Sequence, residues 1–427
     1  MSWVTIVCFI ICFLIIMSFF RPDTDIFSPG RIFTFIWSLA IGLTDLKFSG
    51  LQHEWTPIVW IQLLLGPISF LIGVSFVYVI NIGKRVWSLN ELRSNRQFFE
   101  INHANLFKAI IFLFILFLIA YGAIYLKTHN IPLFSAKPWE ARTNFEMFGI
   151  GLFLHNVILI IFFTGIYSVL VKKDRMRKAI LILISVISIF LYAITLQRFQ
   201  IFLSIFTVLI FLYYSTFRIK VRTIFLTGCL LVVMFYLISS LRAGEIIVAF
   251  LYYSAKMKFP LKYAVFTEPY MYVVMNLENY ARAISKVDTY MYGFYSFDFI
   301  TAITGLKHWI KDYFRLEDYP YLVSRYYNTC SAFWTIYRDF GVLGIFVLPF
   351  GGGLALSSLY YSFMKRPSLQ KLAFYGILLF AAIFSFFDSI IGYLWFEYNL
   401  LMIYLVFKYI SSPRLSKSES KPVEKEL

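Results

Sequence analysis

The sequence carries little charge and lacks the short motifs of several large enzyme classes. Only 15% of its 427 residues are Asp, Glu, Lys or Arg, whereas soluble domains carry about a quarter. The patterns HExxH, GxxxxGK[ST] and GxGxxG are absent, which disfavours metal-driven and nucleotide-driven chemistry. The four cysteines (Cys8, Cys12, Cys229 and Cys330) are scattered, so they predict neither a metal site nor a disulfide framework.

Apolar residues dominate instead. They make up 60% of the chain, and the mean hydropathy is +0.74. Several runs of 18 or more apolar residues could each cross a membrane core of about 30 Å as a helix. Residues 3–20 lack a charged start and a small-residue cleavage site, which favours a retained helix over a removed signal peptide. In such a protein, the net charge of +16 indicates cytoplasmic loops and not nucleic-acid binding.

The expected fold class is an all-α integral membrane protein with about 11 transmembrane helices. The expected spans are 3–20, 31–46, 56–80, 108–126, 147–171, 179–196, 200–216, 223–240, 341–363, 372–388 and 393–410. Four parts follow from this list: helices 1–8 in 1–240, a large extracytoplasmic loop in 241–340, helices 9–11 in 341–410, and a disordered cytoplasmic tail in 411–427.

Short connections rich in Lys and Arg all fall on one side when eleven spans are counted. They are 81–108, 172–178, 217–222, 364–371 and the segment from Arg21 to Arg31. Because such loops favour the cytoplasm, the N-terminus is expected outside and the C-terminus inside. The long segment 241–340 then lies outside. Its tyrosines, phenylalanines and mixed charges predict amphipathic or interfacial helices.

Three arginines fall on the outer side, where loop orientation does not require them: Arg142, Arg198 and Arg242. One interpretation is that these long side chains reach the headgroup phosphates from helix ends. The other is a convergent guanidinium cluster that binds phosphate or pyrophosphate, since each group offers forked donors and keeps its charge. The pair Arg242 and Glu245 also has the i,i+3 spacing of a helix-surface ion pair.

Carboxylates also fall on the outer side: Glu140, Glu245, Glu268, Glu278 and Asp339. A carboxylate can take the proton of an attacking hydroxyl, and each could equally cap a helix or pair with a neighbouring cation. In "RDFG" (338–341), Arg338 and Asp339 either end an interfacial helix or hold a polar group at the membrane surface. "FGGG" (350–353) predicts a bend or close helix packing.

Several degenerate motifs follow one another over roughly residues 120–345. They are "HNIPLFSAKPWEART", the arginines of "TLQRFQ" and "SSLRAGE", "EPYMYVVMNLENYARAI", "YGFYSFDFITAITG" and "NTCSAFWTIYRDFGVLG". In this order and sidedness the chain resembles the oligosaccharide repeat-unit polymerases, the Wzy-type O-antigen and capsule polymerases. The resemblance implies a multispanning fold similar to other lipid-sugar transferases (GT-C-like), in the cytoplasmic (inner) membrane of a bacterium.

The resemblance also implies an activity. Such an enzyme moves a growing glycan from undecaprenyl pyrophosphate to the terminal sugar of an incoming lipid-linked repeat unit, with no cofactor and no metal. Its partners would be this lipid-linked oligosaccharide, membrane lipid, a chain-length regulator and a flippase.

Within that reaction, the pyrophosphate is expected to be bound by Arg142, Arg198 and Arg242. The base is expected among Glu245, Glu140 and Asp339. Sugar hydroxyls are expected to contact Tyr270, Asn276, Asn328 and Arg338, for which interfacial packing and capping are the alternatives.

Two other functions stay open. An O-antigen ligase would have a similar topology and an outer arginine site, and His308 is the one histidine in the long outer segment. A lipid-linked oligosaccharide flippase or transporter would show inverted repeats and charges deep in several helices, and the sequence shows neither.

Overall fold

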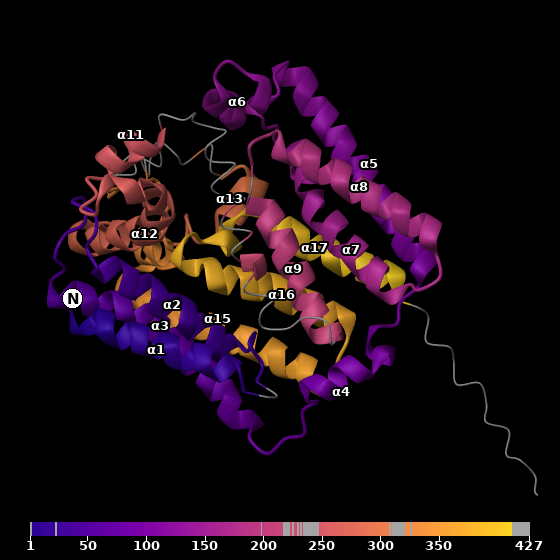
Figure 1. Ribbon diagram of the computed structural model, residues 1–427, viewed down its shortest axis with the longest axis horizontal. Helices are drawn as coiled ribbons and strands as arrows, with labels where there is room; N and C mark the ends of the chain where they lie inside the picture. Colours follow the sequence, from indigo (N-terminus) through magenta and orange to yellow (C-terminus); the bar gives the residue numbers. More distant parts are fainter. Residues whose placement is uncertain are drawn as a thin grey trace, which may run out of the picture.

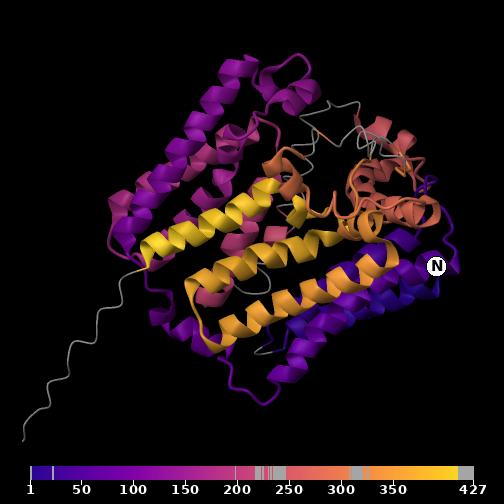
Figure 2. The same cartoon turned by 180° about the vertical axis from the view of Figure 1, so that it is seen from behind.

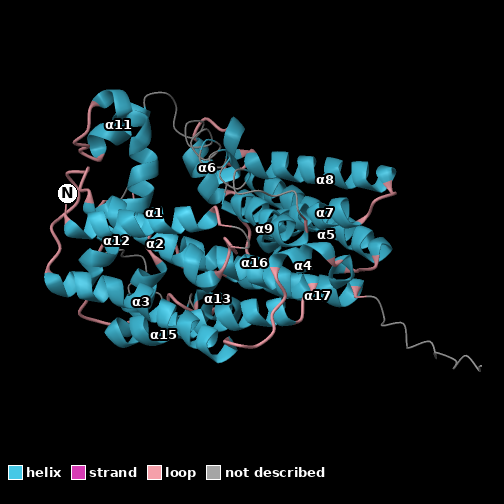
Figure 3. Ribbon diagram, turned by 60° about the horizontal axis from the view of Figure 1, so that its bottom comes forward, coloured by secondary structure: helices cyan, strands magenta, loops and turns pink. Residues whose placement is uncertain are grey.

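A computed structural model describes residues 2–21, 24–197, 199–216, 223, 226–228, 230, 233, 247–306, 309, 321–324 and 327–411. This part of the chain is helical and contains no β-strand (Figure 3), apart from one isolated β-bridge between Ser49 and Met257. Six helical stretches are long and apolar enough to cross a membrane: Pro57–Asn81, His103–Phe134, Ile150–Leu170, Arg175–Ala193, Ala332–Lys365 and Leu369–Phe386. An all-α membrane protein is thereby confirmed as the fold class.

The long helices run between two ends of the molecule. They are α1 (Trp3–Phe19), α2 (Pro29–Asp45), α3 (Pro57–Asn81), α5 (His103–Thr128), α7 (Asn156–Leu170), α8 (Arg175–Ala193), α9 (Phe199–Ser215), α15 (Ala332–Lys365), α16 (Leu369–Ile383) and α17 (Leu394–Ile410). Figure 2 shows α15, α16 and α17 side by side across one face. Apolar side chains such as Phe13 and Leu14 stay exposed on the outside of the bundle, as lipid-facing residues would.

One end, called here the basic end, comprises the connections 82–102, 171–174 and 366–368. It holds α4 (Leu89–Ser94) and η1 (Arg96–Phe99). The amide of Trp87 donates to the carbonyl of Met364 (2.9 Å), and the amide of Asn102 donates to the carbonyl of Ile410 (3.0 Å). These hydrogen bonds tie the connection 82–102 to the last turns of α15 and α17. The exposed cations of its short connections are Lys84, Arg85, Lys172, Lys173 and Arg366.

A buried carboxylate anchors the basic end. Asp25 lies between α1 and α2, and its Oδ2 accepts hydrogen bonds from the hydroxyls of Tyr214 (2.8 Å) and Tyr360 (2.7 Å). Its Oδ1 accepts from the amide of Phe27 (3.0 Å). Burial raises the pKa of the Asp25 carboxyl, and the tyrosine hydrogen bonds oppose that shift. The network joins the start of α2 to the ends of α9 and α15.

The opposite end, called here the aromatic end, comprises 46–56, 129–149, 194–197, 247–306 and 384–393. Its short elements are η2 (Pro132–Phe134), α6 (Pro138–Asn144), η3 (Ile150–His155), α11 (Ile247–Ser254), η4 (Leu261–Phe266), α12 (Thr267–Lys286), α13 (Asp298–Thr304), η5 (Phe384–Phe386) and η6 (Ile390–Gly392). In Figure 1, α6, α11 and α12 lie along the upper left of the view and α4 at the lower right.

Helices α3 and α15 pack closely through glycine. A side chain at Gly73 would collide with the carbonyl of Phe350, and one at Gly353 would collide with the carbonyl of Phe70. Only hydrogen at these positions lets the two backbones approach. The prediction that "FGGG" mediates close helix packing is confirmed.

Helix α15 begins earlier than the sequence predicts, at Ala332 and not at residue 341. Ser331 caps it by accepting from the amide of Trp334 (3.2 Å), which the hydropathy of the long span does not reveal. Gly341 interrupts the helix with φ +62°, and a Cβ there would lie 2.7 Å from the ring of Tyr290. The expected boundary between loop and span at 340/341 therefore coincides with this break, and residues 332–340 form a helical piece that precedes it.

Candidate functional site

Arg142 lies in a connection that is tied to the turn leading into residue 198. It belongs to α6, is half-buried, and its charge acts on the phenol of Tyr192 at the end of α8. The hydroxyl of Tyr192 donates to Oε1 of Gln197 (2.7 Å), and Gln197 directly precedes Arg198 in the chain. A backbone hydrogen bond from Leu133 to Ile194 (3.0 Å) holds the outer connection against the same turn.

An aromatic cluster follows the turn and joins the two sides of the bundle. The ring of Phe199 lies 6.3 Å from that of Phe387 and 6.1 Å from that of Trp395. Phe387 also contacts Tyr272 of α12 (5.8 Å), and Trp395 stacks on His155 (5.6 Å). The segment 384–395 thus sits between the start of α9 and the face of α12.

Asp388 is the acidic side chain of this central segment. Tyr393 donates its hydroxyl to both carboxylate oxygens (2.9 and 3.2 Å), and the amide of Ser389 donates to Oδ1 (2.7 Å). No Lys or Arg of the described chain pairs with it. Burial raises the pKa of Asp388 to about 6, against the lowering effect of the Tyr393 and Ser389 hydrogen bonds. Burial and the charge of Asp388 together raise the pKa of the Cys330 thiol.

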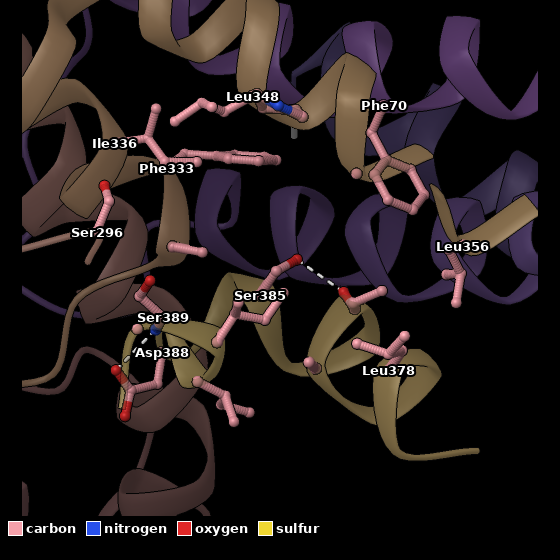
Figure 4. A pocket seen from close by; sticks show the side chains of 18 of the residues that line it. Phe70, Ser296, Phe333, Ile336, Leu348, Leu356, Leu378, Ser385, Asp388 and Ser389 are labelled. Atoms are coloured by element: carbon pink, nitrogen blue, oxygen red, sulfur yellow. Dashed lines mark hydrogen bonds between the residues drawn. The ribbon is translucent and has the colours of Figure 1, made fainter. Parts of the chain in front are cut away.

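Asp388 borders an apolar cavity of about 270 Å³ between α2, α3, α15 and α16. Figure 4 shows phenyl rings and aliphatic side chains around it, including Phe70, Phe333 and Leu348, with Ser296, Ser389 and Asp388 together at one side. The carboxylate therefore stands at the boundary between an apolar interior and the polar aromatic end. A group in this position is desolvated yet reachable, which suits proton transfer.

Two of the predicted residues form a structural clamp. Asp339 is fully buried, and its oxygens accept from the amides of Tyr295 (3.2 Å) and Ser296 (2.5 Å). Arg338 donates to the carbonyl of Thr289 (2.5 Å) and stacks on Tyr321 (5.0 Å). Together they hold the loop 289–296 against α15. These contacts make Asp339 less suitable as a base and Arg338 less suitable as a sugar ligand.

The other described candidates are dispersed over the aromatic end. Tyr270 donates to Gln52 (2.7 Å) and accepts from the amide of Phe48 (3.0 Å), so it anchors the 46–52 connection. Asn276 is buried, and its Nδ2 donates to the carbonyl of Tyr272. Asn328 is exposed. Glu140 is exposed on α6 and forms a surface ion pair with Lys137 (3.2 Å), which is weak in water.

The remaining candidates, Arg198, Arg242 and Glu245, lie outside the described residues, as does His308. Asp388 is the acidic residue that sequence reasoning missed, because the expected span 372–388 absorbs it as the end of an apolar run. The signal was available in "FFDSIIGY", where an acidic residue is followed by Ser and Gly between two apolar runs.

No group of three His, Cys, Asp or Glu side chains comes together as a metal site in the described ranges. No family model, curated protein sequence or solved structure matches the chain.

Proposed function

We propose that the chain is a repeat-unit polymerase of the bacterial cytoplasmic membrane, with eleven spans in a GT-C-like arrangement. It transfers a growing glycan from undecaprenyl pyrophosphate to the terminal sugar of an incoming lipid-linked repeat unit at the outer leaflet. The observation that carries the proposal is the hydrogen bond from Leu133 to Ile194, which ties the connection that holds Arg142 to the turn that leads into Arg198. The same turn contacts the segment that holds Asp388 through Phe199 and Phe387.

The orientation in this proposal puts the basic end in the cytoplasm. The long helices from α1 to α9 alternate between the two ends, as do α15, α16 and α17, and the exposed cations of the connections 82–102, 171–174 and 366–368 share one end. Because lysine and arginine favour the cytoplasmic side, the aromatic end then faces outward. The N-terminus is outside and the C-terminus inside. Undecaprenyl-linked substrates reach that outer face after a flippase has turned them over.

The chemistry requires stabilisation of a departing pyrophosphate. As the bond from the anomeric carbon to the pyrophosphate oxygen breaks, negative charge grows on the leaving oxygens, and fixed guanidinium groups stabilise it. We assign this role to Arg142, Arg198 and Arg242. The acceptor hydroxyl forms the new bond to the anomeric carbon and gives its proton to a carboxylate.

For that carboxylate, Asp388 joins Glu245 as a candidate. Glu140 is exposed and ion-paired, and Asp339 is fully buried beneath the loop 289–296, whereas Asp388 lines the cavity, so Glu140 and Asp339 fit the role less well. Asp388 combines a desolvated position and no described cationic partner, and the ring of its neighbour Phe387 contacts Phe199 at the start of α9. A base needs such a position, because its pKa must lie near the working pH.

The proposal is tested by Arg198→Ala and Arg198→Lys in a host whose own copy is deleted. Arg198→Ala should insert normally but leave single lipid-linked repeat units, visible as loss of the glycan ladder on a gel. Arg198→Lys should restore a short, faint ladder, because the charge stays while forked recognition is lost. A full-length ladder from Arg198→Ala would remove this arginine from the site.

The same gel separates the alternatives. Deletion of a ligase would leave polymerised glycan on its lipid carrier, whereas deletion of a polymerase leaves only single units. Deletion of a flippase would leave the repeat units on the cytoplasmic side, protected from enzymes added outside.

A further inference from the structure

A polar cavity lies apart from Asp388, between α12 and the connection 53–56. Its volume is about 440 Å³. Its walls carry donors and acceptors of both signs: His53, Glu54, Thr56, Glu278, Arg282, Ser285 and Lys286. Pockets of this size bind small molecules, and polar walls of mixed charge select ligands that present both hydroxyls and charge.

One wall of this cavity is held rigidly by a buried ion pair. Glu278 is 2% exposed, and its Oε1 lies 3.3 Å from Nζ of Lys47, which is 15% exposed. Its Oε2 accepts from Nε1 of Trp55 (3.1 Å) and from the amide of His53 (3.4 Å). The Lys47 ammonium also lies over the ring of Trp55, 4.6 Å from its centroid. Both carboxylate oxygens of Glu278 are thus occupied by groups of the connection 46–56.

Arg282 lies one helical turn after Glu278 on α12 and has no partner among the described residues. It is half-buried, and its Nε is buried without a hydrogen bond. Throughout the described chain, no hydrogen bond, ion pair or ring contact involves this side chain. An unpaired, partly desolvated guanidinium is costly unless an acceptor reaches it. The cavity is where such an acceptor would come from.

We infer that this cavity binds a sugar ring that bears a carboxylate, with Arg282 holding the carboxylate. Lys286 adds positive charge at the rim. Glu54 can accept hydrogen bonds from ring hydroxyls, and Ser285 can accept or donate them. A bare phosphate, with its higher negative charge, would meet stronger repulsion from Glu54 than a carboxylate would, and a neutral sugar would leave Arg282 unpaired. The inference rests on the proposed function, because the acidic sugar would belong to the repeat unit or the growing glycan.

The test measures binding of two monosaccharides that differ at one carbon. Methyl β-glucuronide and methyl β-glucoside are titrated into the full chain in lipid nanodiscs, followed by ligand-observed NMR and calorimetry. The wild type should bind the glucuronide at least about tenfold more tightly than the glucoside, because only the glucuronide offers the forked oxygens that Arg282 recognises. Arg282→Met should abolish that preference and keep the packing of the stem.

Two further variants keep the test sharp. Lys258→Ala removes an exposed cation of the aromatic end outside the cavity and should leave the preference unchanged. Thr56→Trp fills the cavity without removing any capping hydrogen bond, and it should weaken glucuronide binding even if Arg282→Met does not fold.

Three results would overturn the inference: equal binding of both sugars by the wild type, an unchanged preference in Arg282→Met, or binding of phosphoethanolamine in place of the glucuronide. The last would indicate a zwitterionic lipid headgroup. The readout needs no polymerisation, so its failure with an intact glycan ladder would leave the proposed function standing. A deletion strain with an unchanged ladder would overturn that function separately.

Discussion

Asp388→Asn should make the protein more stable and less active at the same time. The amide keeps the shape of the side chain and removes its charge. The pKa of Asp388 is about 6 in the folded protein, against about 3.9 for an unperturbed aspartate. Because the folded state holds the proton more tightly, the stability associated with this group is full below pH 4. It falls as the pH rises through 6.

The magnitude follows from the same shift. A difference of about two pKa units corresponds to about 3 kcal/mol, which is an upper value because the side chain borders a cavity. At pH 7.5, Asp388→Asn should therefore raise the free energy of unfolding by about 1–3 kcal/mol. At pH 4.5 the folded carboxyl is mostly protonated while the unfolded one is mostly ionised, so only about a third of the difference should remain. Thermal melting of detergent-solubilised protein at both pH values measures this.

The transferase activity of the wild type should rise with pH while its stability falls, because the ionised carboxylate is the base. About one tenth of Asp388 is ionised at pH 5 and about nine tenths at pH 7. Conversion of lipid-linked repeat units to oligomers should therefore rise about tenfold between these values in the wild type, and Asp388→Asn should lose both the activity and its pH dependence. Tyr393→Phe removes a hydrogen bond that lowers the pKa, so it should shift the rising limb to higher pH.

Asp288→Asn is the matched control, since Asp288 is an exposed carboxylate of the same end. It should change neither curve. An Asp388→Asn protein that keeps its glycan ladder, or a wild type whose activity is flat from pH 5 to pH 7, would refute the assignment of the base. If Asp388→Asn melts at a lower temperature than the wild type at pH 7.5, the electrostatic reasoning is refuted.

Two further predictions concern the bundle itself. Asp25→Ala leaves the hydroxyls of Tyr214 and Tyr360 without their acceptor, so it should lower the free energy of unfolding by about 3 kcal/mol. Tyr360→Phe should lower it by about half as much in the same melting assay. Gly353→Leu should lower the free energy of unfolding by about 1–3 kcal/mol, because the new side chain separates α15 from α3. Gly351→Leu should leave it almost unchanged, because its side chain points into open space. Equal melting temperatures for the two glycine variants would contradict the close crossing.

The long helices were largely predictable from the sequence, because length and apolarity fix what can cross a membrane. The expected span 56–80 is α3 at Pro57–Asn81, and 393–410 is α17 at Leu394–Ile410. Differences arise where a separately capped helical piece precedes the expected span, as residues 332–340 do after Ser331, or where an apolar run continues past its helix. Helix α16 ends at Ile383, five residues before the expected limit, and Asp388 lies beyond it.

The site was harder to predict, since its contacts join residues far apart in the chain. Glu278 meets Lys47 across 231 positions, and Asp25 meets Tyr360 across 335. Neither contact leaves a periodic signal. Hydropathy is also uninformative about which face of a membrane helix is buried, because apolar side chains face lipid as well as protein. Arg142 was singled out because its charge is unexplained on the outer side, a reasoning that does not depend on partners, and its role at the site stays a prediction.

The distribution of buried charge separates structural from functional groups at the aromatic end. Burying a polar or charged group costs free energy that a partner must offset, so a charge with committed partners is explained by the fold. Glu278 and Asp339 are of this kind, because ion pairing or backbone amides occupy their oxygens. Asp388 has no described cationic partner, and Arg282 has no described partner at all. Because the fold alone does not account for these two charges, they are the residues of this end at which substrate chemistry should be sought first.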